Sequence, residues 1–376
     1  MKILMTTDAV GGVWTYTLEL AREFAGHGIQ VALATMGPEP SQDQRSQVRA
    51  IRGTLLCESE YKLEWMEDPW RDVDAAGEWL LELEEILRPD IIHLNGYAHG
   101  SLRWSAPVVM VAHSCVLSWW QAVKHESAPI QTWGVYRDRV QAGVNAANYV
   151  VAPTQAMLDC VRTFYGRKAA MSVVPNGKNF RDFECAGNAA QKEDFIASSG
   201  RLWDEAKNIA AIERIAPQLS WPVYLAGSTA APDGHKATHR HCRLVDVLRP
   251  KEFAIFLSKA SIFCLPARYE PFGLCPLEAA LSGCALVLGD IPSLREIWDD
   301  AAVFVSPEDD QQILNAVRTL ISDSARRNAL AEKARERALR YSAAGMAEAY
   351  KCLYLDLLAD QHSTAPKERK LTACAS

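Results

Sequence analysis

Short apolar runs alternate with longer amphipathic stretches along most of this chain, and that alternation restricts its fold more than any other feature. A run of four to seven apolar residues suits a buried strand, and the stretches between the runs have room for helices. Parallel strands need crossovers of that kind. The pattern therefore predicts an α/β protein with parallel sheets covered by helices. The length of 376 residues favours two domains.

The expected strands form two groups. The first group covers residues 2–6, 30–34, 91–94, 108–112, 149–152 and 172–174, and the second covers 195–198, 223–226, 262–265 and 285–288. Pro175-Asn176-Gly177 interrupts the pattern between them. Proline and glycine end regular elements, so these residues separate the two groups of strands.

Composition excludes several classes of protein. Hydrophobic residues make up 49% and charged residues 23%, as in soluble globular proteins. No stretch approaches twenty apolar residues, so no membrane span is expected, and the first five residues predict a strand rather than a signal peptide. The net charge of −6 gives no general attraction to nucleic acid or anionic lipid. Ten cysteines without C-x-x-C spacing favour free thiols and a cytoplasmic location.

The segment from Ala267 to Gly283 carries the strongest chemical signal. It holds two acids, Glu270 and Glu278, with a proline between them at Pro276 that predicts a helix start. Free N–H groups and the positive end of the helix dipole would then favour an anion such as a diphosphate. If helical, the acids would lie about 12 Å apart. A glycosidase pair needs roughly 5–9.5 Å, so we expect two different roles.

This segment resembles the E-x7-E signature of retaining nucleotide-sugar glycosyltransferases of family 4, which adopt the GT-B fold. The resemblance implies that Glu270 faces the donor sugar and that Glu278 holds the ribose hydroxyls. It also implies that the amides of Phe272, Gly273 and Leu274 meet sugar hydroxyls and phosphate.

Ser199-Gly-Arg-Leu-Trp-Asp-Glu-Ala-Lys-Asn208 is the second strong signal. Arg201 follows an expected strand, and Lys207 lies six residues later near an expected helix start. Two fixed cations there could neutralise a diphosphate leaving group without a metal. The pattern resembles the G-R-L-x(n)-K-G/N motif of the same family.

Three features of the first half belong with these motifs. Gly11 and Gly12 lie between the first expected strand and helix, where backbone can approach a phosphate, and they match the glycine loop of the family. His113 follows the strand at 108–112, and the resemblance implies that it contacts the donor sugar. His93 and His99 flank another strand end and are weaker candidates.

Eight of the eleven tryptophans precede residue 150, in the domain that binds acceptors in this family. Flat aromatic faces suit sugar rings, although most tryptophans are simply core residues. Trp119 and Trp120, just beyond His113, are the best acceptor candidates. Trp14 and Asp8, beside the glycine loop, are candidates for contact with donor or acceptor.

We expect neither a metal site nor a resident cofactor. His235, His239, His241 and Cys242 are the one cluster with possible ligand spacing, but they indicate a polar loop and a helix start. The triplet Asp72-Val-Asp74 leads into an acidic amphipathic helix, where helix capping explains it better than manganese binding.

The resemblance implies a GT-B enzyme with two Rossmann-like domains whose parallel sheets face each other across a cleft. We expect an acceptor-binding domain over residues 1–178, a nucleotide-sugar-binding domain over 179–345, a helix crossing back to the first domain over 346–361, and a disordered tail over 362–376. The expected reaction moves a sugar, with retention and without a metal, from an NDP-sugar, UDP-sugar favoured, to a hydroxyl acceptor.

Acids outnumber bases in the first half, so a soluble saccharide or small glycoside is favoured as acceptor over a membrane lipid. Other GT-B activities, such as nucleotide-sugar epimerase or phosphorylase, are the alternatives within enzymes. A catalytically silent sugar-nucleotide-binding partner protein is the alternative outside them.

Overall fold

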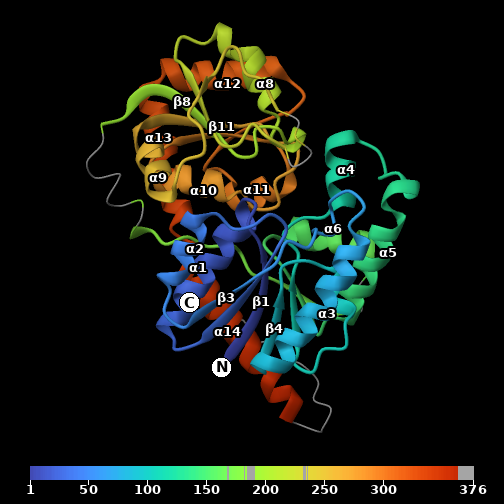
Figure 1. The fold of residues 1–376 in the computed structure, drawn as a ribbon. Coiled ribbons are helices and arrows are strands. Elements are labelled where there is room, and N and C mark those ends of the chain that lie inside the picture. Colours follow the sequence, from blue (N-terminus) through green and yellow to red (C-terminus); the bar gives the residue numbers. More distant parts are fainter. Residues whose placement is uncertain (167–168, 182, 184–190, 232–233, 235, 363–376) are drawn as a thin grey trace.

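The computed structural model describes residues 1–166, 169–181, 183, 191–231, 234 and 236–362. Figure 1 shows two α/β domains, one above the other. The first contains a seven-stranded sheet of order β3-β2-β1-β4-β5-β6-β7, and the second a six-stranded sheet of order β10-β9-β8-β11-β12-β13. Neighbouring strands in both sheets are parallel. These are Rossmann-like sheets, and the predicted fold class is confirmed.

The elements of the first domain follow the expected alternation. Its strands are β1 (Lys2–Asp8), β2 (Gln30–Met36), β3 (Thr54–Glu58), β4 (Ile91–Leu94), β5 (Val108–Val111), β6 (Tyr149–Ala152) and β7 (Ala170–Val173). Its helices are α1 (Gly12–Gly26), α2 (Gln42–Arg49), α3 (Trp70–Leu87), the short η1 (Ala98–Ser101), α4 (Val116–Lys124), α5 (Ile130–Ala146) and α6 (Gln155–Tyr165).

The second domain repeats the architecture. Its strands are β8 (Glu193–Ser199), β9 (Val223–Ala226), β10 (Arg243–Leu244), β11 (Ala260–Leu265), β12 (Ala285–Gly289) and β13 (Val303–Val305). Its helices are η2 (Glu205–Lys207), α8 (Ile209–Ile215), η3 (Ala216–Gln218), α9 (Pro250–Lys259), α10 (Leu274–Leu281), α11 (Pro292–Trp298), α12 (Asp310–Ser322) and α13 (Ser324–Ala338). The last helix, α14 (Ala343–His362), returns to the first domain.

All ten expected strands are present, and three further strands were not expected. These three are β3, β10 and β13, and each lies at an edge of its sheet. An edge strand is buried less than a central one, so its sequence carries a weaker apolar run. The residues of β3, for example, are half-buried or exposed.

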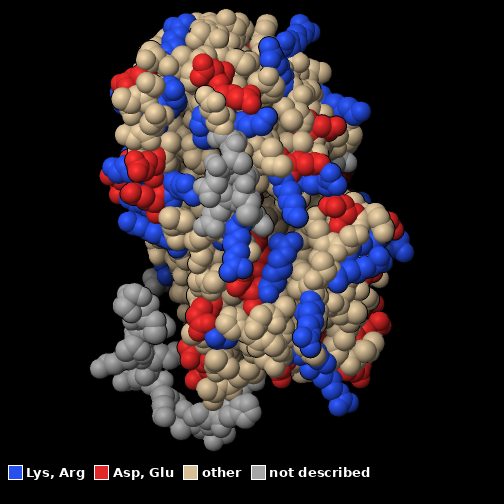
Figure 2. Space-filling model, turned by 90° about the vertical axis from the view of Figure 1, so that its left-hand side faces the viewer, with Lys and Arg blue, Asp and Glu red and all other residues tan. Residues whose placement is uncertain are grey.

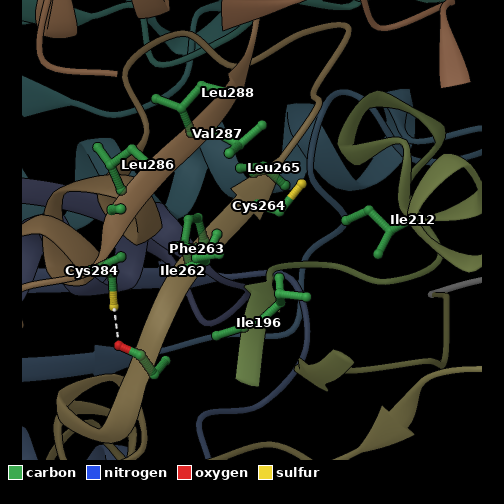
Figure 3. Packing of buried hydrophobic residues seen from close by; sticks show 14 of the residues in the cluster. Ile196, Ile212, Ile262, Phe263, Cys264, Leu265, Cys284, Leu286, Val287 and Leu288 are labelled. Carbon is green, nitrogen blue, oxygen red and sulfur yellow. Dashed lines mark hydrogen bonds between the residues drawn. The ribbon is translucent and has the colours of Figure 1, made fainter. Parts of the chain in front are cut away.

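The core of the second domain fixes the strand that leads to the strongest sequence motif. Every residue of β11 and of β12 is buried. Figure 3 shows their side chains packed with Ile196 of β8 and Ile212 of α8. Cys284 directly precedes β12, and its thiol lies 3.3 Å from each of the carbonyl oxygens of Leu257 and Ala260, to which it donates. The loop that follows β11 therefore begins at a strand that is firmly held by its packing.

Helix α14 completes the core of the first domain. Its Tyr350 and Tyr354 are fully buried beside Tyr16 and Phe24 of α1. His93 of β4 lies among these rings, 2.5 Å from the Tyr354 hydroxyl and 3.2 Å from that of Tyr16. Burial lowers the pKa of His93 to about 3, so the ring is neutral. In this structure His93 therefore packs and hydrogen-bonds within an aromatic cluster.

His99 is also buried, and its Nε2 atom lies 2.9 Å from the Val73 carbonyl oxygen, to which it is hydrogen-bonded.

The sequence predicted a disordered tail over residues 362–376. Residues 363–376 lie outside the described residues, while His362 is the last residue of α14.

The chain passes between the two domains twice, near Lys178 and near Ser342, and these two crossings lie side by side. Lys178 donates its N–H to the Tyr341 carbonyl oxygen, and Ala343 donates to the Lys178 carbonyl oxygen, at 3.0 Å each. Lys178 and Ser342 thereby form a parallel bridge. At Gly177 a Cβ atom would overlap the Ser342 carbonyl group, so this close approach requires glycine.

Candidate active site

Gly273 sets the geometry of the loop before α10. Its φ of 94° is left-handed, and a Cβ there would lie 3.2 Å from the Pro276 side chain and 3.3 Å from Leu294. The prediction that the helix starts near Pro276 was wrong by two residues, because α10 begins at Leu274. The first N–H groups of a helix have no intrahelical partner, so proline is tolerated at the third position as well as the first.

Glu270 and Lys207 meet in an ion pair in front of that helix start. The Lys207 ammonium donates to Glu270 Oε2, and both side chains are mostly buried. The Glu270 backbone is held as well, since Ser293 Oγ donates to its carbonyl oxygen at 2.5 Å. The aliphatic part of the Lys207 side chain lies beside Gly200. Its Cγ and Cε atoms would each be 3.5 Å from a Cβ atom at Gly200. The sequence motifs around residues 201–207 and 270–278 therefore converge.

Arg201 and Asp204 form a second pair beside the first. The guanidinium donates to Asp204 Oδ2 at 3.2 and 2.7 Å. Burial alone would raise the pKa of Asp204, but the charges of Arg201 and Lys207 outweigh it and hold this pKa below its ordinary value. Two cations and two carboxylates thus stand together at the carboxyl end of β8, where ligands of α/β folds bind.

The glycine loop of the first domain faces the start of α10. Gly11 has φ 83° and precedes the first residue of α1. A Cβ on Gly12 would lie 3.7 Å from Leu274 Cδ1. Asp8 accepts from the Val10 N–H at 2.9 Å, which shapes the turn. Burial raises the pKa of Asp8 to about 6, against the opposing charge of Arg201 in the other domain.

The hydrogen bonds of Asn95 define the tautomer of His113. Asn95 Nδ2 lies 2.7 Å from the Thr6 carbonyl oxygen, which can only accept, so Oδ1 is the atom that faces His113. His113 Nε2, at 2.8 Å, must then carry the proton. Burial lowers the pKa of His113 to about 3. The ring is therefore neutral, and Nδ1 is a hydrogen-bond acceptor.

Asn95 has a role that the sequence interpretation missed. The available signal was its position directly after β4, comparable to that of His113, which lies two residues beyond β5. Because β4 and β5 are parallel neighbours, both residues come to the same edge of the sheet.

Direct bonds between the domains hold the loop at 269–271. The Tyr269 hydroxyl accepts from the Cys115 N–H at 3.1 Å and lies 2.8 Å from Ser118 Oγ. Thr154 Oγ1 donates to the Pro271 carbonyl oxygen at 2.9 Å. Both domains therefore build this site.

The tryptophan candidates have unequal positions. Trp14 is 5% exposed, belongs to the first-domain core and donates its ring N–H to Gln47 at 3.2 Å, so it offers no open face in this structure. Trp119 donates to Asp204 Oδ1 at 3.3 Å across the domain boundary. Trp120 packs edge-on against Trp119, with 6.1 Å between ring centroids, and is half-buried.

Within the described part of the chain, no group of three His, Cys, Asp or Glu residues could hold a metal ion. His239 lies 3.7 Å from Glu213, and His235 falls outside the described residues. Asp72 is in the first turn of α3, and Asp74 pairs with Arg139 at 2.5 Å.

Among the described residues, no helix combines the length and the apolar character needed to cross a bilayer. On the face shown in Figure 2, basic and acidic side chains are interspersed over both domains. That face therefore presents no extended field of one sign.

The raised pKa of Asp8 predicts a pH-dependent stability. Between its ordinary value of 3.8 and about 6, the folded protein binds more protons at Asp8 than the unfolded chain. The free energy of unfolding therefore falls as pH rises through this window. Asp8→Asn keeps an acceptor for the Val10 N–H but does not ionise. We expect this variant to exceed the wild type in stability by about 2–3 kcal/mol above the window and to match it below.

Urea denaturation at several pH values measures the difference, with the exposed Asp194→Asn as control. A difference between Asp8→Asn and wild type that does not change with pH would contradict this assignment of the pKa.

Comparisons with known proteins agree with this geometry. The model of "Glycosyltransferase Family 4" matches residues 10–180, and that of "Glycosyl transferases group 1" matches residues 183–337. The glycogen synthase of Mycobacterium tuberculosis is 38% identical over 384 residues, covering 90% of each chain. The D-inositol 3-phosphate glycosyltransferase of Corynebacterium glutamicum is 25% identical, covering 95% of this chain and 94% of the relative.

Solved structures share the fold. Sucrose-phosphate synthase from Thermosynechococcus elongatus superposes with a TM-score of 0.79 at 18% identity, over 96% of this chain and 100% of the other. Anabaena HepE in complex with UDP-glucose gives a TM-score of 0.73 at 15% identity, over 96% of this chain and 100% of the other. The chain belongs to the family 4 glycosyltransferases and has the GT-B fold.

Proposed function

We propose that this glycosyltransferase moves a hexosyl group, with retention and without a metal, from an NDP-sugar to a hydroxyl of a saccharide or small glycoside. One observation carries the proposal. The Lys207–Glu270 pair and Arg201 stand beside the start of α10, with the glycine loop of the first domain facing that helix start.

The leaving diphosphate binds at this convergence. Lys207 and Arg201 supply fixed positive charge, and the free N–H groups at the start of α10 add the positive end of its dipole. These charges stabilise the negative charge that develops as the bond to the anomeric carbon breaks. On binding, the diphosphate competes with Glu270 and Asp204 for the two cations, which frees Glu270 to meet the donor sugar.

The acceptor attacks from the face that the diphosphate leaves, and a donor phosphate oxygen takes its proton. The neutral state of His113 supports this route, because an imidazole with a pKa of about 3 is a weak base and takes up little proton at neutral pH. Its Nδ1 instead accepts a hydrogen bond from a sugar hydroxyl. Positioning and charge stabilisation are the contributions of the protein.

The names of the relatives and structural neighbours favour particular donors and acceptors. A neighbour of the same fold holds UDP-glucose, which favours a UDP-sugar donor. A relative that is 38% identical bears the name glycogen synthase, which favours a soluble saccharide acceptor. D-inositol 3-phosphate is the second acceptor candidate, since a relative named for it aligns over 95% of this chain. Seven described cysteines have free thiols, which supports a cytoplasmic location: Cys57, Cys115, Cys160, Cys242, Cys264, Cys275 and Cys284.

Two assays test the substrates. Thermal-shift screening of UDP-, ADP- and GDP-sugars identifies the donor, since a ligand at a hundredfold excess over its Kd stabilises the native state by about 2.7 kcal/mol. Transfer from that donor to glucan oligosaccharides and to inositol phosphate then distinguishes the acceptors. Binding without transfer to any acceptor would favour a silent binding protein. Conversion of the donor sugar alone would favour an epimerase.

Domain closure gives a further prediction. Gly12 and His113 lie in the first domain, and Lys207 and Glu270 in the second, so a complete site needs both domains together. We expect the donor complex to be more compact than the free protein, because closure excludes water that would hydrolyse the donor. Small-angle scattering with and without a non-reactive donor analogue measures this. Identical profiles at saturating analogue would contradict closure.

A further inference from the structure

Lys178 places its ammonium between two carboxylates from different domains. Its Nζ atom lies 3.0 Å from Glu19 Oε1 of α1 and 3.0 Å from Glu278 Oε1 of α10. The three side chains are 5%, 3% and 12% exposed, respectively. The sequence interpretation gave no role to Lys178 or Glu19.

The cluster of Lys178, Glu19 and Glu278 depends on the positive charge of the Lys178 ammonium. Burial alone would lower the pKa of Lys178, but the charges and hydrogen bonds of Glu278 and Glu19 outweigh it and raise this pKa above its ordinary value. The ammonium is therefore charged at neutral pH. Without it, Glu278 would lose its paired ammonium in a nearly buried position, and Glu19 would keep Arg22 as its cation at 3.8 Å.

Lys178 also occupies a distinctive place in the chain. Its backbone bridges Ser342, so it sits where the two crossings between the domains run together. Points near a pivot move least when two bodies rotate. A contact from Lys178 to Glu278 can therefore persist whether the domains are open or closed, unlike a contact from elsewhere in the first domain.

We propose that Lys178 is a positioning residue for the ribose site. It holds the Glu278 carboxylate in place through Oε1, so that the carboxylate can accept hydrogen bonds from the two ribose hydroxyls of the donor. Glu19 anchors the ammonium from the first domain. This inference rests on the proposed function, in which Glu278 binds the ribose of a nucleotide sugar.

The test compares two ligands that differ only in the ribose hydroxyls. Isothermal titration measures the Kd of UDP and of 2′,3′-dideoxy-UDP, or of the matching ADP pair if screening selects adenine. For the wild type we expect the ribonucleotide to bind about tenfold or more tightly, the size of effect that hydrogen bonds to a charged group give. Lys178→Met keeps most of the side-chain volume and removes the charge. We expect its preference for the ribonucleotide to fall close to one, with dideoxynucleotide affinity nearly unchanged.

Two further variants separate positioning from loss of structure. Lys178→Arg retains the charge and should restore part of the preference. Lys333→Met removes a lysine that pairs with Asp300 on the surface of the second domain, and it should keep the full preference. If Lys178→Met does not fold by circular dichroism, Glu19→Gln/Lys178→Met removes one of the two negative charges as well. The same loss of preference is then expected.

The outcomes distinguish the inference from the proposed function. Absence of nucleotide binding to the wild type would overturn both. A wild type that prefers the ribonucleotide, together with a folded Lys178 variant that keeps the same preference, would overturn the inference alone. A general loss of affinity for both ligands in Lys178→Met would also overturn it, because a purely structural role predicts that result.

Discussion

Replacing Lys207 with alanine is expected to lower kcat by about a hundred- to a thousandfold while the protein stays folded. The ammonium lies beside Glu270 in a mostly buried position, where it would face the leaving diphosphate. One preorganised contact to developing charge is typically worth about 2.7–4 kcal/mol in a water-poor site. Steady-state kinetics under saturating donor, with thermal melting as a check on folding, measures the effect.

Arg201→Ala should act in the same direction but less strongly, because its side chain is 43% exposed and its charge is screened by solvent. Arg214→Ala is the matched control, since Arg214 pairs with Asp310 at 2.6 Å on an exposed surface. Wild-type kcat in both the Lys207 and Arg201 variants would contradict the placement of the leaving group between them.

Gly177→Ala is expected to destabilise the protein strongly for a change that adds a single methyl group. The added Cβ would overlap the Ser342 carbonyl group and lie 2.7 Å from the Ala343 nitrogen, both parts of the backbone. The two crossings, at residues 177–178 and 342–343, must then separate. Such overpacking lowers the free energy of unfolding by about 1–3 kcal/mol. Each kcal/mol corresponds to about 2–4 °C in melting temperature for domains of this size. Scanning calorimetry measures the shift.

Gly26→Ala provides the matched control. No atom lies within 4 Å of a Cβ at Gly26, and its position at the end of α1 favours alanine slightly over glycine. We expect this variant to melt at or slightly above the wild-type temperature. Equal melting of the Gly177 and Gly26 variants would mean that the two crossings are not tightly paired in solution.

The buried parts of the fold could be predicted from the sequence, whereas its edges could not. Strands β4 and β9 have the bounds that their apolar runs indicated, since a central parallel strand is apolar along its whole length. The edge strand β10 spans only two exposed residues, which leaves no apolar pattern to detect. The start of α10 was misplaced because proline tolerates several positions in a first turn.

The site motifs were visible in the sequence, but their ion pairs were not. Lys207 and Glu270 are 63 residues apart, and nothing local to either one indicates the other as a partner. The same holds for Asn95 and His113, which only the sheet brings together. Trp14 belongs to the first-domain core, and its sequence context could not indicate this, because the sequence does not distinguish a buried indole in a core from one that faces a ligand.

The central claim is that a site shared by the two domains transfers a sugar from an NDP-sugar with retention. Proton NMR of the reaction in progress, run with the donor selected by thermal shift and its best acceptor, tests it directly. The anomeric coupling constant at the new glycosidic bond reports the configuration of the product, because a glycoside does not mutarotate. We predict that this product has the configuration of the donor sugar, and that it forms about a hundred- to a thousandfold more slowly in the Lys207→Ala reaction. A product with the inverted anomeric configuration would contradict retention and the placement of acceptor and diphosphate on one face of the sugar.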